Sequence, residues 1–136
     1  MLDRLLRPRS EIAFAVLRVL VGLLFTFHGM QKVFGILSTG QPPLGSQLWI
    51  GGVLELVTGL AVASGFLTTC AALVASGEMA VAYIQFHWRF AFDSHFFPAI
   101  NKGELAVVYC FVFLYIACHG PGPFSADAMR GRRAGG

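Results

Sequence analysis

The sequence predicts an all-α protein in which four transmembrane helices form an antiparallel bundle, with both termini in the cytoplasm. Hydrophobic residues make up 56 % of the 136-residue chain and charged residues only 12 %, about half the charged share of a soluble domain. The long apolar runs also lack the solvated face that helices of soluble proteins carry. Arginines precede the first run and follow the last, so the positive-inside rule places both termini in the cytoplasm and requires an even number of spans.

Apolar runs separated by breaker segments define the four spans. We expect helices at about 12–35, 47–66, 70–88 and 103–119, which are near the length that crosses a bilayer. Glycines and prolines fill Ser38–Gly45, which predicts a connection outside the membrane after the first span. The last residues, 128–136, are basic and glycine-rich, which favours a flexible tail. We therefore expect a single membrane domain over residues 1–136.

The first predicted helix carries three ionisable residues within a run that is otherwise apolar. At about 100° per residue, Arg18, His28 and Lys32 fall in one narrow sector of that helix. An ionisable side chain at membrane depth costs roughly 2.5 to 3.5 kcal/mol, so it usually has a partner and faces protein or water. We therefore expect this sector to face the interior of the bundle.

Two acidic residues on the next helices are candidate partners for these cations. At a rise of about 1.5 Å per residue, Glu55 and Glu78 lie at depths that match those of the basic residues. We predict that Arg18 pairs with Glu78, and that His28 or Lys32 pairs with Glu55. Such ion pairs could form part of a functional site, or they could simply select one packing of the helices.

On the second predicted helix, glycines lie on the same face as the acidic residue Glu55. Gly51, Glu55 and Gly59 recur every four residues, so a neighbouring helix can approach closely there. We expect this stripe to be a packing face.

Further polar residues lie near the outer ends of the helices. Gln85 lies near the end of the third, and Asn101 and Glu104 open the fourth. Together with His28, Lys32 and Glu55, they could line a polar pocket near the outer face. The N-x-x-E spacing also resembles a capping box, in which Asn101 would cap the helix and Glu104 would reach back.

The sequence has no motif for a metal or a redox cofactor. His28, His87 and His95 match no ligand spacing, and the three cysteines form no zinc or CxxC pattern. The chain also lacks ligand patterns for haem, flavin or Fe–S clusters, so electrons would have to come through a bound quinone or a partner. A histidine beside a carboxylate can relay protons or bind an anionic or quinone-like head group.

Segments along nearly the whole chain carry a further pattern. They are Arg18, Phe27–Gly35, Gly51–Gly59, Glu78–Tyr83, Phe97–Tyr109 and Gly120–Asp127. In their order and spacing they resemble the DoxX family of small four-helix membrane proteins. The family pattern places polar residues where Arg18, His28, Lys32, Glu55, Asn101, Glu104, Ser125 and Asp127 stand. Ser125 and Asp127 would form a motif at the cytoplasmic end of the chain.

This resemblance implies a multi-pass protein of the cell (inner) membrane that is an auxiliary subunit of a membrane redox system. The family is similar to a subunit of a thiosulfate:quinone oxidoreductase, which implies a pocket for a quinone or a small anion. Other relatives have assembly roles, so the alternative is a non-enzymatic membrane anchor or assembly factor, and catalysis itself stays open. Expected partners are the lipid bilayer, other redox subunits or a second copy. The arginines carry no nucleic-acid-binding motif.

Overall fold

The structure is a computed structural model that describes residues 2–134, and all regular secondary structure in this range is helical. This confirms the predicted all-α class. The long helices are α2 (Ser10–Phe34), α3 (Gln47–Ser64), α4 (Thr68–Ala82) and α6 (Glu104–His119), and the π-helix η2 (Tyr83–Trp88) continues α4. Each begins and ends within about two residues of the limits that hydropathy suggests, because apolar runs and Gly or Pro breakers are local signals.

Short helices connect or extend these four. α1 (Leu2–Leu6) and the 3-10 helix η1 (Arg7–Arg9) lead into α2, and η3 (Ser94–Phe96) and α5 (Pro98–Asn101) lie between η2 and α6. The helix α7 (Ala126–Ala134) occupies most of the segment where we expected a flexible tail. It begins at a capping serine, since Ser125 Oγ accepts a hydrogen bond from Ala128 N at 3.2 Å. The last two residues of that tail, 135–136, lie outside the described range.

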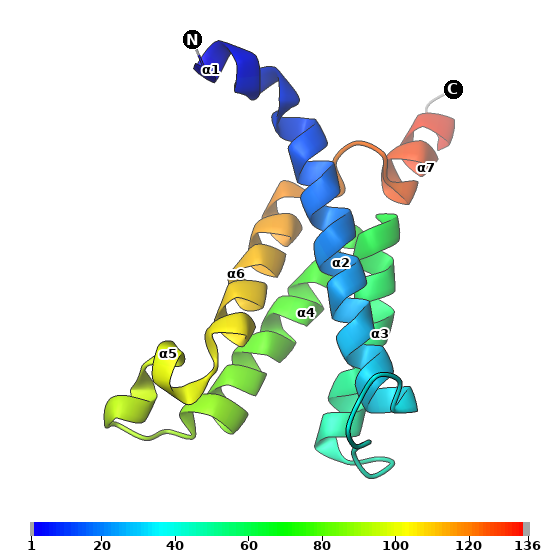
Figure 1. Ribbon diagram of the computed structural model, residues 1–136. Helices are drawn as coiled ribbons and strands as arrows, with labels where there is room; N and C mark the ends of the chain where they lie inside the picture. The colour runs from blue at the N-terminus through cyan, green and yellow to red at the C-terminus, as the bar shows by residue number, and fades with distance from the viewer. Residues whose placement is uncertain (1, 135–136) are drawn as a thin grey trace.

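The long helices form two pairs (Figure 1). α2 lies beside α3, and α4 lies beside α6. The two pairs meet near α7 and spread apart toward the opposite end, where η2 and α5 lie. The first described helix, α1, lies at the same end of the molecule as α7.

Glycines bring α2 and α3 into close contact. A Cβ atom added at Gly29 would lie 2.4 Å from Leu56 N, and one added at Gly22 would lie 2.5 Å from Ala63 N. On α3, Gly59 takes part in this contact as expected, but Gly52 replaces Gly51, whose nearest side chain is Glu78 of α4. The interface therefore has the small-residue packing typical of membrane helices.

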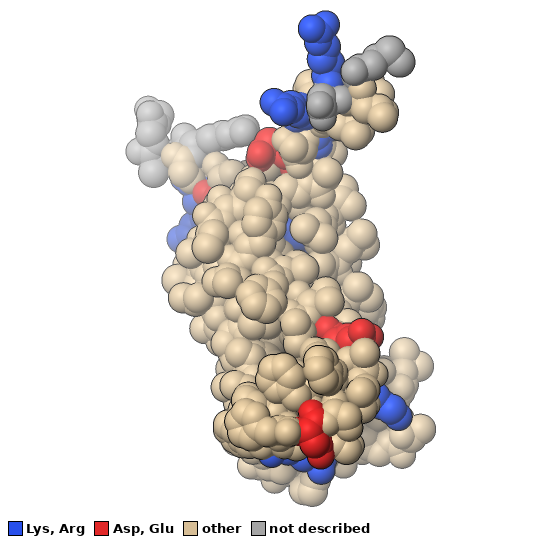
Figure 2. Space-filling model, turned by 90° about the vertical axis from the view of Figure 1, so that its left-hand side faces the viewer, with Lys and Arg blue, Asp and Glu red and all other residues tan. Residues whose placement is uncertain are grey.

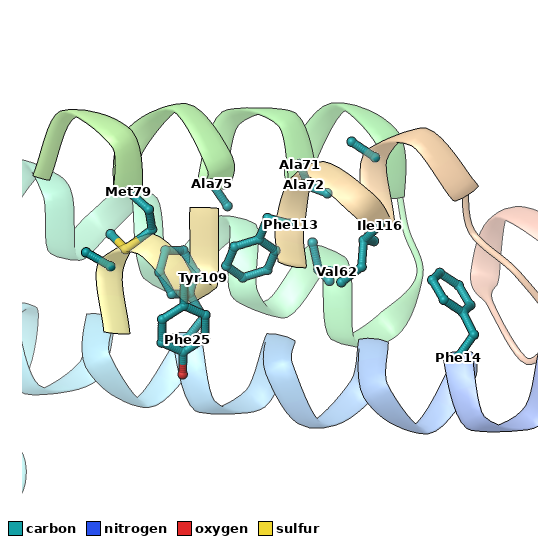
Figure 3. Packing of buried hydrophobic residues seen from close by; sticks show 12 residues of the cluster. Phe14, Phe25, Val62, Ala71, Ala72, Ala75, Met79, Tyr109, Phe113 and Ile116 are labelled. Atoms are coloured by element: carbon teal, nitrogen blue, oxygen red, sulfur yellow. The ribbon is translucent and has the colours of Figure 1, made fainter. Parts of the chain in front are cut away.

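An aromatic and aliphatic core joins the two pairs near their crossing (Figure 3). Phe25 of α2 lies against Phe113 of α6, with ring centroids 4.7 Å apart, and Tyr109 stacks on Phe113 at 5.7 Å. Val62 and Ile116 are also fully buried beside them. On α4 the facing residues are alanines (Ala71, Ala72 and Ala75), which let α6 pack closely.

The exterior is that of a protein in a membrane. Within residues 2–134, three helical segments are long and apolar enough to cross one, namely Arg4–Phe34, Gln47–Ser64 and Thr68–Trp88, whereas Glu104–His119 is apolar but shorter. Charged side chains gather toward the two ends of the molecule, and a broad uncharged surface lies between them (Figure 2). Large apolar side chains are exposed along all four long helices, which lipid would cover.

Candidate functional site

An ion pair between a partly exposed lysine and a buried acid lies between α2 and α3. Lys32 Nζ is 2.5 Å from Glu55 Oε1, and the Glu55 side chain is only 3 % exposed. Gly52 makes room for this pair, because a Cβ atom there would lie 2.5 Å from Lys32 Cβ. The pairing is one of the two that the sequence suggested for Glu55. The second oxygen, Glu55 Oε2, is buried and has no hydrogen-bond partner among the described residues.

Glu78 of α4 brings a second carboxyl group to the same region. Its Oε1 would be 3.1 Å from a Cβ atom at Gly51 on α3, so the acid faces that helix. Its Oε2 is buried and also lacks a hydrogen-bond partner among the described residues. Two buried carboxyl oxygens without partners therefore lie beside one lysine, and such groups are costly unless a ligand, water or proton satisfies them.

These groups form the polar wall of an apolar groove between α3 and α4. The groove has a volume of about 400 Å³, and Lys32, Glu55 and Glu78 line it together with many apolar residues. Several of the apolar residues, such as Leu54 and Val74, are themselves exposed on the lipid-facing surface. We call this space the α3–α4 groove. It combines a polar wall with an apolar side opening, which suits an amphiphilic ligand.

A smaller and more polar cavity lies on the other side of the ion pair. It has a volume of about 200 Å³, and its polar lining consists of His28, Lys32, Glu55, His87, Lys102 and Tyr109. We call it the histidine cavity. Because Lys32 and Glu55 line both spaces, the ion pair lies between them. The sequence prediction missed Lys102 and Tyr109, and it considered His87 only as a metal ligand. No local sequence pattern indicates that these three residues line the same cavity.

The remaining pocket candidates serve mainly to connect segments. The Gln85 side-chain carbonyl accepts a hydrogen bond from Gln47 Nε2, which links η2 to the start of α3 at the edge of the groove. Asn101 Nδ2 donates to His95 O at 2.8 Å, and Asn101 Oδ1 accepts from Gly103 N at 2.8 Å. The capping box is therefore corrected: Asn101 holds the turn before α6, and Glu104 makes no return bond within the described residues.

Arg18 does not pair with Glu78, which corrects the other predicted ion pair. Its guanidinium is fully buried and donates to Val62 O at 2.7 Å, Ala63 O at 2.8 Å and Phe124 O at 2.9 Å. The first two carbonyls belong to the last turn of α3, where backbone oxygens have no partner inside the helix. The negative end of the helix dipole also favours a cation there. Arg18 therefore joins the end of α3 to the segment before α7, and its Nε is buried without a hydrogen-bond partner among the described residues.

Ser125 and Asp127 complete the same cluster, which we call the Arg18 clamp. The Asp127 carboxylate accepts hydrogen bonds from Leu67 N at 3.0 Å, Thr68 N at 2.9 Å and Thr68 Oγ1 at 2.9 Å, so it caps the N-terminus of α4. Partial burial raises the pKa of the Asp127 carboxyl, but the hydrogen bonds from Thr68 and Leu67 lower it more, so the pKa lies below its usual range. Ser125 is buried and its hydroxyl donates to Gly122 O at 2.8 Å.

No group of three or more metal-binding side chains occurs in the described range. Glu55, Glu78 and Lys32 on the polar wall and the apolar remainder of the α3–α4 groove are the residues that would hold the ring and the tail of a quinone.

Comparisons with known proteins agree with the membrane character of the chain. The family model for DoxX matches residues 13–88. An uncharacterized protein of Haemophilus influenzae is 38 % identical over 117 residues, which cover 83 % of this chain and 87 % of the relative. The inner membrane protein YqjF of Escherichia coli is 27 % identical over 135 residues, covering 94 % of this chain and 99 % of that protein. No solved structure matches the chain.

Proposed function

Because the chain belongs to the DoxX family and is a multi-pass inner-membrane protein, we propose that it is an auxiliary subunit of a membrane redox system. Its role there is to hold a quinone head group in the α3–α4 groove. The observation that carries this proposal is the pair of buried, unpartnered carboxyl oxygens, Glu55 Oε2 and Glu78 Oε2, on the polar wall of an otherwise apolar groove.

The proposal includes a four-span bundle with both termini in the cytoplasm, built as one domain over residues 1–136. Two features support it. α6 (Glu104–His119) is apolar and packs along α4, and the first and last described helices, α1 and α7, lie at one end of the molecule (Figure 1). The 16 residues of α6 extend about 24 Å at a rise of about 1.5 Å per residue, which is less than the roughly 30 Å thickness of the hydrocarbon core. The turn before α6 and the segment after it supply the remaining depth.

The residues of the groove have separate tasks in this proposal. Lys32 Nζ donates a hydrogen bond to a ring oxygen and stabilises negative charge on it. The Glu78 carboxyl, which forms no salt bridge within the described residues, accepts or returns a proton at the other ring oxygen. The exposed apolar residues of α3 and α4 contact the tail.

A bound quinone supplies the ability to take up two electrons and two protons. The chain's own residues exchange only protons, so the electrons come from a partner subunit. His28 and His87, in the histidine cavity behind the ion pair, connect Glu55 with the end of the bundle that bears η2. A small anion in that cavity is the second ligand that these residues could hold.

Ligand-dependent stabilisation of the purified protein tests the quinone site. Thermal unfolding is measured in detergent with short-chain ubiquinone and menaquinone analogues. The control compound is the isoprenoid tail alone, without the quinone ring. At a concentration 100 times Kd, a ligand stabilises by about 2.7 kcal/mol. We expect this shift in the wild type and in Glu104→Gln, which changes an exposed acid, and its loss in Glu78→Gln. A shift with the ringless tail, or an equal shift in Glu78→Gln, contradicts the proposal.

The alternative function is a non-enzymatic membrane anchor or assembly factor. The Arg18 clamp supports this alternative. Arg18, Ser125 and Asp127 stand at polar positions of the family pattern, and they bond to the protein's own backbone and to Thr68. Crosslinking in native membranes, followed by mass spectrometry, distinguishes the two functions. An anchor would be recovered with non-redox partners and would show no quinone-dependent stabilisation.

A further inference from the structure

A third cavity, between η2 and α5, is separate from the groove and has an unusual lining. It has a volume of about 320 Å³, and its polar lining consists of His87, Arg89, His95, Asn101 and Lys102. Phe86, Trp88, Ala91 and Ile100 complete its wall. We call it the η2–α5 cavity. From this lining we propose that the cavity binds the phosphate-type oxyanion of a small molecule or a lipid head group, a function beyond the quinone site.

The charge of the cavity points to an anion. Arg89 and Lys102 are permanent cations, two histidines accompany them, and no carboxylate lines the space. Two acids lie close along the chain, and neither lines the cavity: Asp93 is bound to His95, with its Oδ1 3.0 Å from His95 Nδ1, and Glu104 follows Lys102 by two residues. Within the described residues, neither Arg89 nor Lys102 forms a salt bridge. Arg89 and Lys102 are both exposed, so water and salt screen their mutual repulsion, and an anion between them would gain a charge-assisted hydrogen bond from each.

Hydrogen-bond donors remain available in the cavity. The Arg89 side chain uses Nε to bond Phe86 O at 3.2 Å, and a guanidinium has five N–H groups in a planar fork. That fork matches the oxygens of a phosphate, and the ammonium group of Lys102 can add a charge-assisted bond. The cavity therefore offers a bidentate donor and a second cation.

The backbone gives an independent observation. Arg89 and Lys102 both have left-handed conformations, with φ of 54° and 61°, where they end η2 and α5. Glycine usually occupies such positions because it adopts this conformation without strain. Here both positions hold long cations that line one cavity. Of the six non-glycine residues with this conformation in the described range, these two are the ones with charged side chains, and strained residues occur preferentially at ligand sites.

The π-helix contributes to the same cavity. A π-helical turn inserts an extra residue into α-helical geometry and is frequent at functional sites. In η2 it brings His87 to α5, with His87 Nδ1 3.1 Å from Asn101 O. His87 and Lys102 line both this cavity and the histidine cavity. Trp88 and Phe86 resemble the aromatic residues of a membrane interface, so a lipid phosphate and a dissolved phosphate both have access.

Tryptophan emission provides a local test. The chain has two tryptophans, so Trp49→Phe leaves Trp88, which lines the cavity, as the single reporter. The full-length protein in a neutral detergent is titrated with sodium phosphate against sodium chloride at constant ionic strength. We expect a saturable change in Trp88 emission. Replacing both cations with glycine, by Arg89→Gly and Lys102→Gly, should raise the apparent Kd at least about tenfold.

The glycine variants separate charge from fold. Since glycine relieves the left-handed backbone, their thermal unfolding temperature should equal or exceed that of the parent. Asparagine also tolerates the left-handed region. If the glycine variants unfold, the double variant Arg89→Asn with Lys102→Asn repeats the test. Arg130→Gln removes a charge beside Phe66, near the α7 end, and should leave the titration unchanged.

Nanodiscs distinguish the two sources of phosphate. With phosphatidylglycerol added to phosphatidylcholine, a lipid site should change Trp88 emission and reduce the response to inorganic phosphate, whereas a site for a dissolved anion should keep that response. The proposal is overturned if neither inorganic phosphate nor phosphatidylglycerol gives a saturable change. It is also overturned if the glycine and asparagine variants respond like the parent.

Discussion

The carboxylate of Asp127 accepts two hydrogen bonds from Thr68, one from its backbone N–H and one from its hydroxyl, each 2.9 Å long, although 59 positions separate the two residues. Most helix caps are supplied by the residue just before the helix. Here the residue before α4 is Leu67, which has no capping side chain. The cap therefore comes from the far end of the chain and fixes the C-terminal segment to the start of α4.

Removing this cap should destabilise the protein. Asp127→Ala leaves the N–H groups of Leu67 and Thr68 without their acceptor, and the loss of a helix cap costs about 1 kcal/mol. Thermal unfolding in detergent measures the change. Asp93→Ala serves as the matched control, because that carboxylate caps only the short helix η3 in an exposed connection. An equal loss in both variants would contradict a special role for Asp127.

The same carboxylate should make stability depend on pH. Since hydrogen bonding holds the pKa of Asp127 below its usual range, the folded state binds this proton less readily than the unfolded state does. The stabilising contribution is therefore complete above the unfolded pKa of about 3.9 and disappears as the pH falls through the folded value. The difference in unfolding temperature between the wild type and Asp127→Asn should shrink below about pH 4. A difference that stays constant would contradict this assignment.

Arg18 and Glu78 should behave as independent residues. Arg18→Leu leaves Ala63 O and Phe124 O without their donor, whereas Val62 O keeps a bond from Gly65 N. The expected loss is at least about 2 kcal/mol, since each unsatisfied buried acceptor costs about 1 to 3 kcal/mol. Adding Glu78→Leu should not restore stability, because the two side chains share no bond. Recovery of most of the loss in the double variant would show that the original pairing forms in the membrane.

Lys32 and Glu55 should, in contrast, be strongly coupled. Lys32→Met leaves a buried carboxyl without its cation, and breaking a buried ion pair costs about 3 to 5 kcal/mol. Glu55→Gln in the same chain removes the uncompensated charge and should recover much of that loss. A double-mutant cycle on unfolding free energy gives the coupling energy, and a value near zero would contradict the pair.

Adding a single methyl group at the α2–α3 interface should destabilise the protein. Gly29→Ala places a Cβ atom 2.4 Å from Leu56 N, so the helices must separate, and such overpacking typically costs about 1 to 3 kcal/mol. Gly77→Ala on α4 is the control, since a Cβ atom there meets nothing within 4 Å. The control should be neutral or stabilise by about 0.5 to 1 kcal/mol through helix propensity. Equal effects at both glycines would contradict this packing.

Sequence reasoning located the acid and base residues but paired them only in part. Depth along the helices correctly brought Lys32 near Glu55. The same reasoning failed for Arg18, because it considered only carboxylates as partners, whereas the guanidinium bonds to backbone carbonyls of α3 and of the segment before α7. Ser125 and Asp127 entered only through family resemblance, since their partners lie in a distant turn.

The sequence by itself determined the helices and their approximate ends, because hydropathy and breaker residues act within one segment, and the resemblance of its motifs indicated the family. Only the tertiary structure decided which groups converge. It brought Lys102 and Tyr109 to the histidine cavity, and Arg89 and Lys102 to the η2–α5 cavity. These meetings depend on how two helix pairs spread apart and on a π-helical turn at the end of α4. Such geometry follows from long-range packing, and no local pattern of residues specifies it.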